Sequence, residues 1–213
     1  MTTFAKIKNR PARDMKAALL PVLGLCGKAD DPIHSFTGAL CIDSDGKDLV
    51  FWTTSYSAVF ASKIEAEEVT NNVKMTIRPS CFSVLVEHIK KAKIRLDVEI
   101  IQASEDKIPK LQVTTENETL VFKDMMNPEH PDHRMFLKRT EKQISTPEPA
   151  YFKPKTFLPF LNAFKNVQHV NIMYSVSESE DASDMHIRTT HKEPFVRFEA
   201  FILGCHPSFF KQK

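Results

Sequence analysis

A unit of one strand, one helix and three further strands occurs three times along the chain, and this repetition limits the possible folds more than any other feature. In the first copy, residues 3–7 form a predicted strand, and residues 11–23 place apolar side chains on one face of a predicted helix. Three further strands are predicted at 36–43, 47–54 and 56–64. Alternation of a helix with strands is common in α+β proteins, but a threefold recurrence with similar spacing exceeds what chance predicts.

Two local signals refine the first copy. The segment Ser44-Asp45-Gly46 lies between two predicted strands and indicates a hairpin turn. Pro11 suits the first turn of the helix, whereas Pro21 lies inside it. We expect Pro21 to kink or shorten the helix, because proline lacks the N–H donor and its ring clashes with the preceding turn.

The second and third copies follow the same order. The second has a predicted strand at 73–77, a helix at 79–92, and strands at 95–103, 110–115 and 119–123. The side chains expected to face the core from this helix are Phe82, Leu85, Val86 and Ile89. The third has a short strand at 151–153, a helix at 154–164, and strands at 170–176, 185–190 and 195–203.

The copies suggest how the chain is divided. Residues 1–127 form a predicted domain of two units, and 128–149 form a connector rich in proline, histidine and charge. Residues 150–205 form a half domain or second domain, and 206–213 form a tail.

The charged residues suggest where nucleic acid would bind. The formal net charge is only +2, so such affinity must come from a local arrangement of charge. Acidic residues concentrate in segments 65–68, 116–118 and 178–184, whereas the helix faces away from the apolar stripes are basic. Cations facing a phosphate backbone give a salt-sensitive affinity that is independent of base sequence. The alternative is that they only solvate exposed helices. The candidate DNA-binding residues are Arg10, Arg13, Lys16, His88, Lys90, Lys91, Lys153, Lys155 and Lys165.

The sequence lacks the usual signatures of catalysis and of cofactor binding. It has five glycines and contains neither a G-x-x-x-x-G-K nor a G-x-G-x-x-G motif. His130, His133 and His206 lack a fourth ligand at a spacing typical of zinc, and a solvated connector is the preferred interpretation. We therefore expect no enzyme activity, no cofactor and no metal.

Cysteine usage and hydropathy indicate the compartment. The four cysteines, Cys26, Cys41, Cys81 and Cys205, lie among apolar neighbours and form no C-x-x-C pair, which favours free thiols in a reducing compartment. No apolar stretch approaches the ~18 residues of a membrane span, and residues 1–10 lack the apolar region of a signal peptide. We expect a soluble, cytoplasmic protein that does not bind membranes.

Several segments resemble the DNA polymerase sliding clamps, more the bacterial type than the eukaryotic one. Residues 18–25 (ALLPVLGL) and 36–42 (FTGALCI) are similar to the first helix of a clamp and the strand after it. Residues 75–85 (MTIRPSCFSVL) are similar to the stretch where a clamp strand runs through a proline into the next helix. Residues 119–122 (TLVF), followed by 127–131 (NPEHP), look like the last strand of a clamp domain and its exit loop.

The resemblance implies an α+β fold of repeated β-α-β-β-β units, the DNA clamp fold, with sheets outside a closed ring and helices lining its hole. It implies a non-catalytic processivity factor that encircles duplex DNA without regard to sequence. The implied partners are a DNA polymerase, a clamp loader and further copies of the chain. Small clamps of this length are known from phage and viral replication, which suggests a phage-like protein in the host cytoplasm.

The number of units departs from the clamp pattern. A clamp domain contains two units and six domains close a ring, so a two-domain subunit would have four helices rather than three. Either a degenerate fourth unit lies near residues 134–145 and three copies close the ring, or the chain is one and a half domains and four copies are needed. A third alternative is a clamp relative that no longer forms a ring.

Short apolar segments are the candidate partner contacts. They are Met135, Phe136 and Leu137 in the connector, and Phe209 and Phe210 in the tail. The tail could instead pack onto the last sheet, or act as the clamp-binding peptide of a clamp client. A second functional hypothesis is a protein-interaction module, such as a viral structural or host-takeover factor, that does not encircle DNA.

Overall fold

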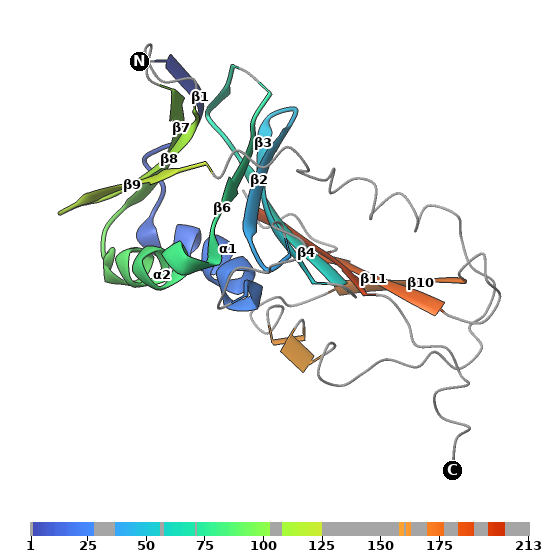
Figure 1. Ribbon diagram of the computed structural model, residues 1–213. Coiled ribbons are helices and arrows are strands. Elements are labelled where there is room, and N and C mark those ends of the chain that lie inside the picture. Colours follow the sequence, from blue (N-terminus) through green and yellow to red (C-terminus); the bar gives the residue numbers. More distant parts are fainter. Residues whose placement is uncertain are drawn as a thin grey trace.

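The computed structural model shows two antiparallel sheets and two α-helices within the residues that it describes (Figure 1). These residues are 2–27, 37–55, 58–70, 72–102, 108–124, 158–159, 161–162, 170–176, 183–189 and 196–202. No helix among them is long and apolar enough to cross a membrane.

The first copy of the repeated unit has the predicted order of one strand, one helix and three strands. Its elements are β1 (Thr2–Ile7), α1 (Ala12–Leu25), β2 (Leu40–Asp45), β3 (Asp48–Ser55) and β4 (Ala58–Glu65), followed by the short β5 (Glu68–Val69). The predicted hairpin is confirmed, because Asp45 pairs with Asp48 across a turn in which Gly46 has a φ of 62°. Glycine adopts such a positive φ without steric cost.

Helix α1 runs through Pro21 and ends at Leu25, so the expected shortening of this helix is wrong. The carbonyl of Ala17 is the group that would have accepted a bond from residue 21. Ala17 is exposed, so water can satisfy its carbonyl and the helix can continue.

The second copy has the same order of elements, but a 3₁₀ turn precedes its α-helix. Its elements are β6 (Lys74–Ile77), the 3₁₀ turn η1 (Pro79–Cys81), α2 (Phe82–Lys91), β7 (Leu96–Gln102), β8 (Lys110–Thr115) and β9 (Thr119–Lys123). Phe82, Leu85 and Ile89 are buried as predicted, and Val86 is half-buried against the core. The predicted first turn at Pro79 is therefore a 3₁₀ turn that leads into the α-helix.

The two copies interlock by exchanging their first strands. Strand β1 pairs with β7 of the second copy, and β6 pairs with β2 of the first copy. The resulting sheets have the strand orders β5-β1-β7-β8-β9 and β10-β11-β12-β4-β3-β2-β6. Neither copy can therefore form its sheet alone, and both helices are held beside the same core.

The third copy extends the sheet of the first. Its strands β10 (Val170–Val176), β11 (Ser183–Thr189) and β12 (Val196–Ile202) agree with the three predicted strands. Strand β12 pairs antiparallel with β4, from Val196 opposite Ile64 to Ile202 opposite Ala58. The predicted strand at 151–153 lies outside the described residues. The same is true of most of the predicted helix at 154–164, although residues 158–159 and 161–162 are helical.

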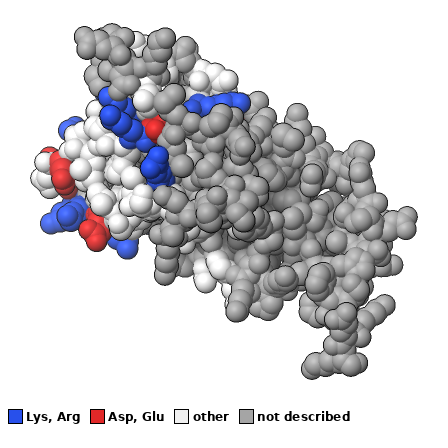
Figure 2. Space-filling model, in the orientation of Figure 1, with Lys and Arg blue, Asp and Glu red and all other residues white. Residues whose placement is uncertain are grey.

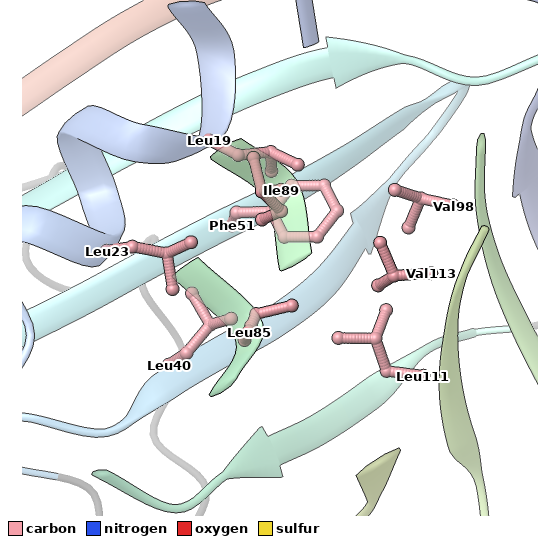
Figure 3. A pocket seen from close by; sticks show the side chains of 9 residues that line it. All are labelled: Leu19, Leu23, Leu40, Phe51, Leu85, Ile89, Val98, Leu111 and Val113. Carbon is pink, nitrogen blue, oxygen red and sulfur yellow. The ribbon is translucent and has the colours of Figure 1, made fainter. Parts of the chain in front are cut away.

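The main core lies between the two helices and the two sheets. Met15 and Leu19 from α1, Leu85 and Ile89 from α2, and Phe51 from β3 are all at most 4% exposed. The core contains a small gap of about 10 Å³, whose entirely apolar lining is drawn in Figure 3. Its lining residues are Leu19, Leu23, Leu40, Phe51, Leu85, Ile89, Val98, Leu111 and Val113. A gap of this size and lining is a packing defect rather than a ligand site.

A second apolar cluster is separate from this core. It consists of Cys41, Val50, Trp52, Val59 and Ala61, all at most 2% exposed, on strands β2, β3 and β4. The Trp52 indole N–H donates to Oδ2 of Asp43 at 2.9 Å, and Asp43 is itself buried. The seven-stranded sheet therefore buries apolar side chains apart from the helix-facing core.

Candidate nucleic-acid interface

The start of helix α1 lies beside the end of helix α2 (Figure 1). The N–H of Ala12, the first residue of α1, donates to the carbonyl of Ile94 at 3.0 Å. One turn further along α1, Nζ of Lys16 donates to the carbonyl of Lys90 at 2.8 Å. These two bonds place the first turn of one helix against the last turn of the other.

The local sequence explains why the helices begin and end there. Pro11 precedes α1 with an extended conformation and a φ of −54°, close to the value that its ring imposes. Helix α2 ends at Lys91, because Ala92 has a ψ of 130° and leaves the helical conformation. Lys90 and Lys91 in the last turn are favourable, since cations complement the negative end of the helix dipole.

Basic side chains gather where these two ends meet, and we call this surface the basic end. It consists of Arg10, Arg13, Lys16, Lys90, Lys91, Lys93 and Arg95. Arg10 and Lys16 are half-buried, and the other five are exposed. The first five were predicted as DNA-binding residues, and the helix contacts bring them to one place. Figure 2 shows basic side chains prominent on the described part of one molecular face, with a few acidic ones among them.

Sequence reasoning missed Lys93 and Arg95. Both residues follow the last turn of α2, and the prediction considered only the outward faces of the helices. Their position depends on the backbone pairing of Arg95 with Pro11, which joins residues 84 positions apart. A local pattern cannot reveal a contact of that kind, although the density of cations in 90–95 was visible.

The placement of His88 on the exposed face of α2 is wrong. His88 is 3% exposed, and its Nε2 lies 3.0 Å from the carbonyl oxygen of Val113 on β8. Its Nδ1 lies 3.5 Å from a carboxylate oxygen of Glu118 in the β8–β9 turn. The ring therefore faces the sheet, because a buried polar group needs a hydrogen-bond partner and Val113 provides one.

Acidic side chains near the basic end are tied to the protein itself. Oδ1 of Asp97 accepts a bond from the backbone N–H of Asn9 at 2.9 Å, and Asp97 is buried. Oε1 of Glu116 accepts a bond from the backbone N–H of Lys93 at 2.8 Å. The second oxygen of Asp97, Oδ2, also lies 4.0 Å from Nε of Arg95, so Asp97 partly offsets one cation of the basic end. Glu116, by contrast, is directed at the backbone of the segment after α2.

Arg10 also borders an open hollow of about 390 Å³ whose lining is of mixed sign. Its lining includes Lys47 at the β2–β3 turn and the carboxylates of Glu65 and Glu67 near β5. The acidic segment predicted at 65–68 is therefore next to Arg10, so Arg10 is less well placed for an anion than Arg13.

The remaining predicted contacts lie outside the described residues. They are Lys153, Lys155 and Lys165 for DNA, and Met135, Phe136, Leu137, Phe209 and Phe210 for partners. The three histidines weighed as metal ligands also lie outside them. Among the residues that are described, no group of three or more His, Cys, Asp or Glu side chains could hold a metal ion.

Comparison with known proteins identifies the fold. The sequence matches no family model and no curated protein. The structure is similar to the DNA polymerase III beta subunit of Thermotoga maritima, with a TM-score of 0.64 and 8% identity over 97% of this chain and 66% of that one. It is also similar to the DNA polymerase sliding clamp of Pseudomonas aeruginosa, with a TM-score of 0.60 and 11% identity over 99% of this chain and 67% of that one.

A third similar structure is the Helicobacter pylori beta clamp bound to a DNA ligase peptide, with a TM-score of 0.57 and 11% identity over 94% of this chain and 66% of that one. This chain thus spans about two thirds of the length of the clamps that it matches. The predicted α+β sliding-clamp fold is confirmed, and the resemblance seen in the sequence is to proteins that share this fold.

Proposed function

We propose that this protein is a non-catalytic sliding-clamp subunit that encircles duplex DNA and tethers a replication enzyme to it. The basic end is the observation that carries the proposal, because it joins five predicted phosphate contacts, four on the two helices of a clamp fold and Arg10 just before the first helix. Phosphate contacts of this type bind any sequence and permit sliding. A ring needs no more than such weak contacts, since its closure prevents dissociation.

The proposal includes assembly of several copies. Strand β9 is an edge of the five-stranded sheet, and no strand in the described ranges pairs with its outer side. Its counterpart in the first copy, β4, is paired with β12. By this correspondence, we assign the free edge of β9 to the seam with a neighbouring copy, with three or four copies closing the ring.

A DNA polymerase and a clamp loader are the proposed protein partners. The Helicobacter pylori clamp bound to a DNA ligase peptide supports partners that dock through short peptides. Met135, Phe136, Leu137, Phe209 and Phe210 remain the proposed contacts for such peptides, and Lys153, Lys155 and Lys165 remain proposed DNA contacts on the third unit. A module that binds only protein is the alternative, and it predicts no affinity for DNA.

Reversal of charge on α2 tests the DNA-binding surface. We expect Lys90→Glu/Lys91→Glu to weaken binding to a short labelled duplex and to reduce the slope of log K against log salt concentration by about 2, roughly 0.9 for each lysine–phosphate interaction removed. The measurement is fluorescence anisotropy over a range of NaCl concentrations.

The matched control is Lys47→Glu/Lys74→Glu, which reverses two exposed lysines on the seven-stranded sheet and its β2–β3 turn. The control should leave the slope close to that of the wild type. An equal reduction in both double variants would show that net charge alone governs binding, and would contradict the assignment of the helices.

A further inference from the structure

The segment between α2 and β7 projects three exposed side chains from a fixed backbone. Lys93, Ile94 and Arg95 are all exposed, and Ile94 is 73% exposed. Single exposed apolar residues are common, so Ile94 by itself indicates nothing. The two flanking cations are more informative, because they lie directly after Lys90 and Lys91 at the basic end. Nε of Arg95 lies 4.0 Å from Oδ2 of Asp97, and the Arg95 side chain is 53% exposed.

Contacts from two other parts of the chain, the start of α1 and the β8–β9 turn, hold this segment. The Ile94 carbonyl accepts the bond from Ala12 of α1, and Arg95 pairs with Pro11. Oε1 of Glu116, in the β8–β9 turn, accepts the Lys93 N–H at 2.8 Å. A loop tied at successive residues loses little further conformational entropy on binding, and this favours its use as a contact surface.

Glu116 is an acidic residue next to the cations of the basic end. A carboxylate beside several cations would ordinarily repel phosphate and weaken DNA binding. The pKa of the Glu116 carboxyl is lowered, first by the bond from its own backbone N–H and next by the bond from that of Lys93. The side chain is therefore ionised at neutral pH and directed at the backbone of the loop.

We propose that residues 93–95 form a preformed DNA-contacting loop, in which Lys93 and Arg95 bind backbone phosphates and Glu116 is the residue that positions them. This inference rests on the proposed function and adds contacts outside the helices. It makes an acidic side chain a requirement for binding an anion. A purely electrostatic account of the same surface predicts the opposite effect of removing that side chain.

Two substitutions of Glu116 separate these accounts. Glu116→Ala removes both the negative charge and the anchor, and we expect it to weaken binding to a short duplex several-fold. Glu116→Gln removes the charge but keeps an oxygen that accepts the Lys93 N–H, and we expect binding at least as tight as that of the wild type. Tighter binding by Glu116→Ala than by the wild type would overturn the positioning role.

The cations are tested in the full chain by Lys93→Glu/Arg95→Glu. The salt slope should fall by about 2, as for Lys90→Glu/Lys91→Glu, and the Lys47→Glu/Lys74→Glu control should not change it. If only the α2 double variant reduces the slope, the loop proposal fails and the proposed function stands. If the wild-type protein does not bind duplex DNA at low salt, both fail. Circular dichroism checks that each variant is folded.

Discussion

The burial of two polar residues, Asp43 and His88, could not be predicted from the sequence around them. Asp43 occurs in a predicted strand, and nothing near it indicates that its carboxylate would be buried and bonded to the indole of Trp52. His88 is a similar case, since a polar residue on an amphipathic helix is normally exposed. Asp43 meets its partner on the neighbouring strand and His88 meets its partner on the sheet that packs against α2, so tertiary contacts decide the burial in both cases.

Cys26 provides a prediction at the scale of one residue. Cys26 as a whole is half-buried, but desolvation of its thiol raises the pKa of Cys26 to about 12. A thiol with a raised pKa is mostly protonated at pH 8, so alkylation by iodoacetamide should be slow there and should keep increasing with pH up to about 12. An ordinary thiol would instead reach its maximum rate soon above its pKa of about 8.5.

Peptide mapping by mass spectrometry measures the alkylation of Cys26 directly, with the urea-unfolded protein as the control for intrinsic reactivity. Native Cys26 should react much more slowly than the same residue in the unfolded chain at pH 8. Equal rates in the two states would contradict the burial of this thiol.

At the scale of elements, the sequence predicted the strands and the two described helices well, because their apolar periodicity is strong. It did not predict which strands pair. The exchange of β1 and β6 between copies, and the pairing of β4 with β12, depend on contacts between residues far apart in the sequence. The basic end depends on such contacts, which explains why its members on α1 and α2 and just before α1 were predicted, whereas Lys93 and Arg95 after α2 were not.

The contact of His88 with β8 predicts a structural rather than a DNA-binding role. His88→Leu replaces the imidazole with an apolar side chain of similar size and leaves the Val113 carbonyl without this partner. We expect the free energy of unfolding to fall by about 1–3 kcal/mol, measured by urea denaturation. The salt slope of DNA binding should not change.

Glu87→Gln, at the exposed neighbouring position, is the control and should alter the free energy of unfolding by less than about 0.5 kcal/mol. The His88 account would be wrong if His88→Leu reduced the salt slope by about 1 while leaving stability unchanged. That result would restore His88 as an exposed phosphate contact.

At the scale of the whole molecule, the three copies of the unit raise the question of assembly. Unpaired edge strands readily pair with other chains, and proteins normally protect them. If β9 is the seam, Val121→Glu should disrupt assembly, because Val121 is 51% exposed on that strand and a carboxylate there would be forced into the interface. Light scattering should then give a lower mass than for the wild type.

Val84→Glu is a matched control, since Val84 is 52% exposed on the outward face of α2. It should leave the assembly mass unchanged. The wild-type mass should be three or four times the 24.3 kDa of one chain, which also decides between the two proposed ring sizes. If Val121→Glu has the wild-type mass, the seam does not lie at β9.

Encirclement of DNA is tested most directly by comparing a nicked circular plasmid with the same plasmid after linearisation. Protein is loaded on each at low salt and high protein concentration, and the amount that co-elutes with DNA in gel filtration at physiological salt is measured. The proposed ring should stay with the circle and slide off the ends of the linear form. Equal retention on both forms would contradict encirclement, because simple phosphate binding does not depend on whether the DNA has ends.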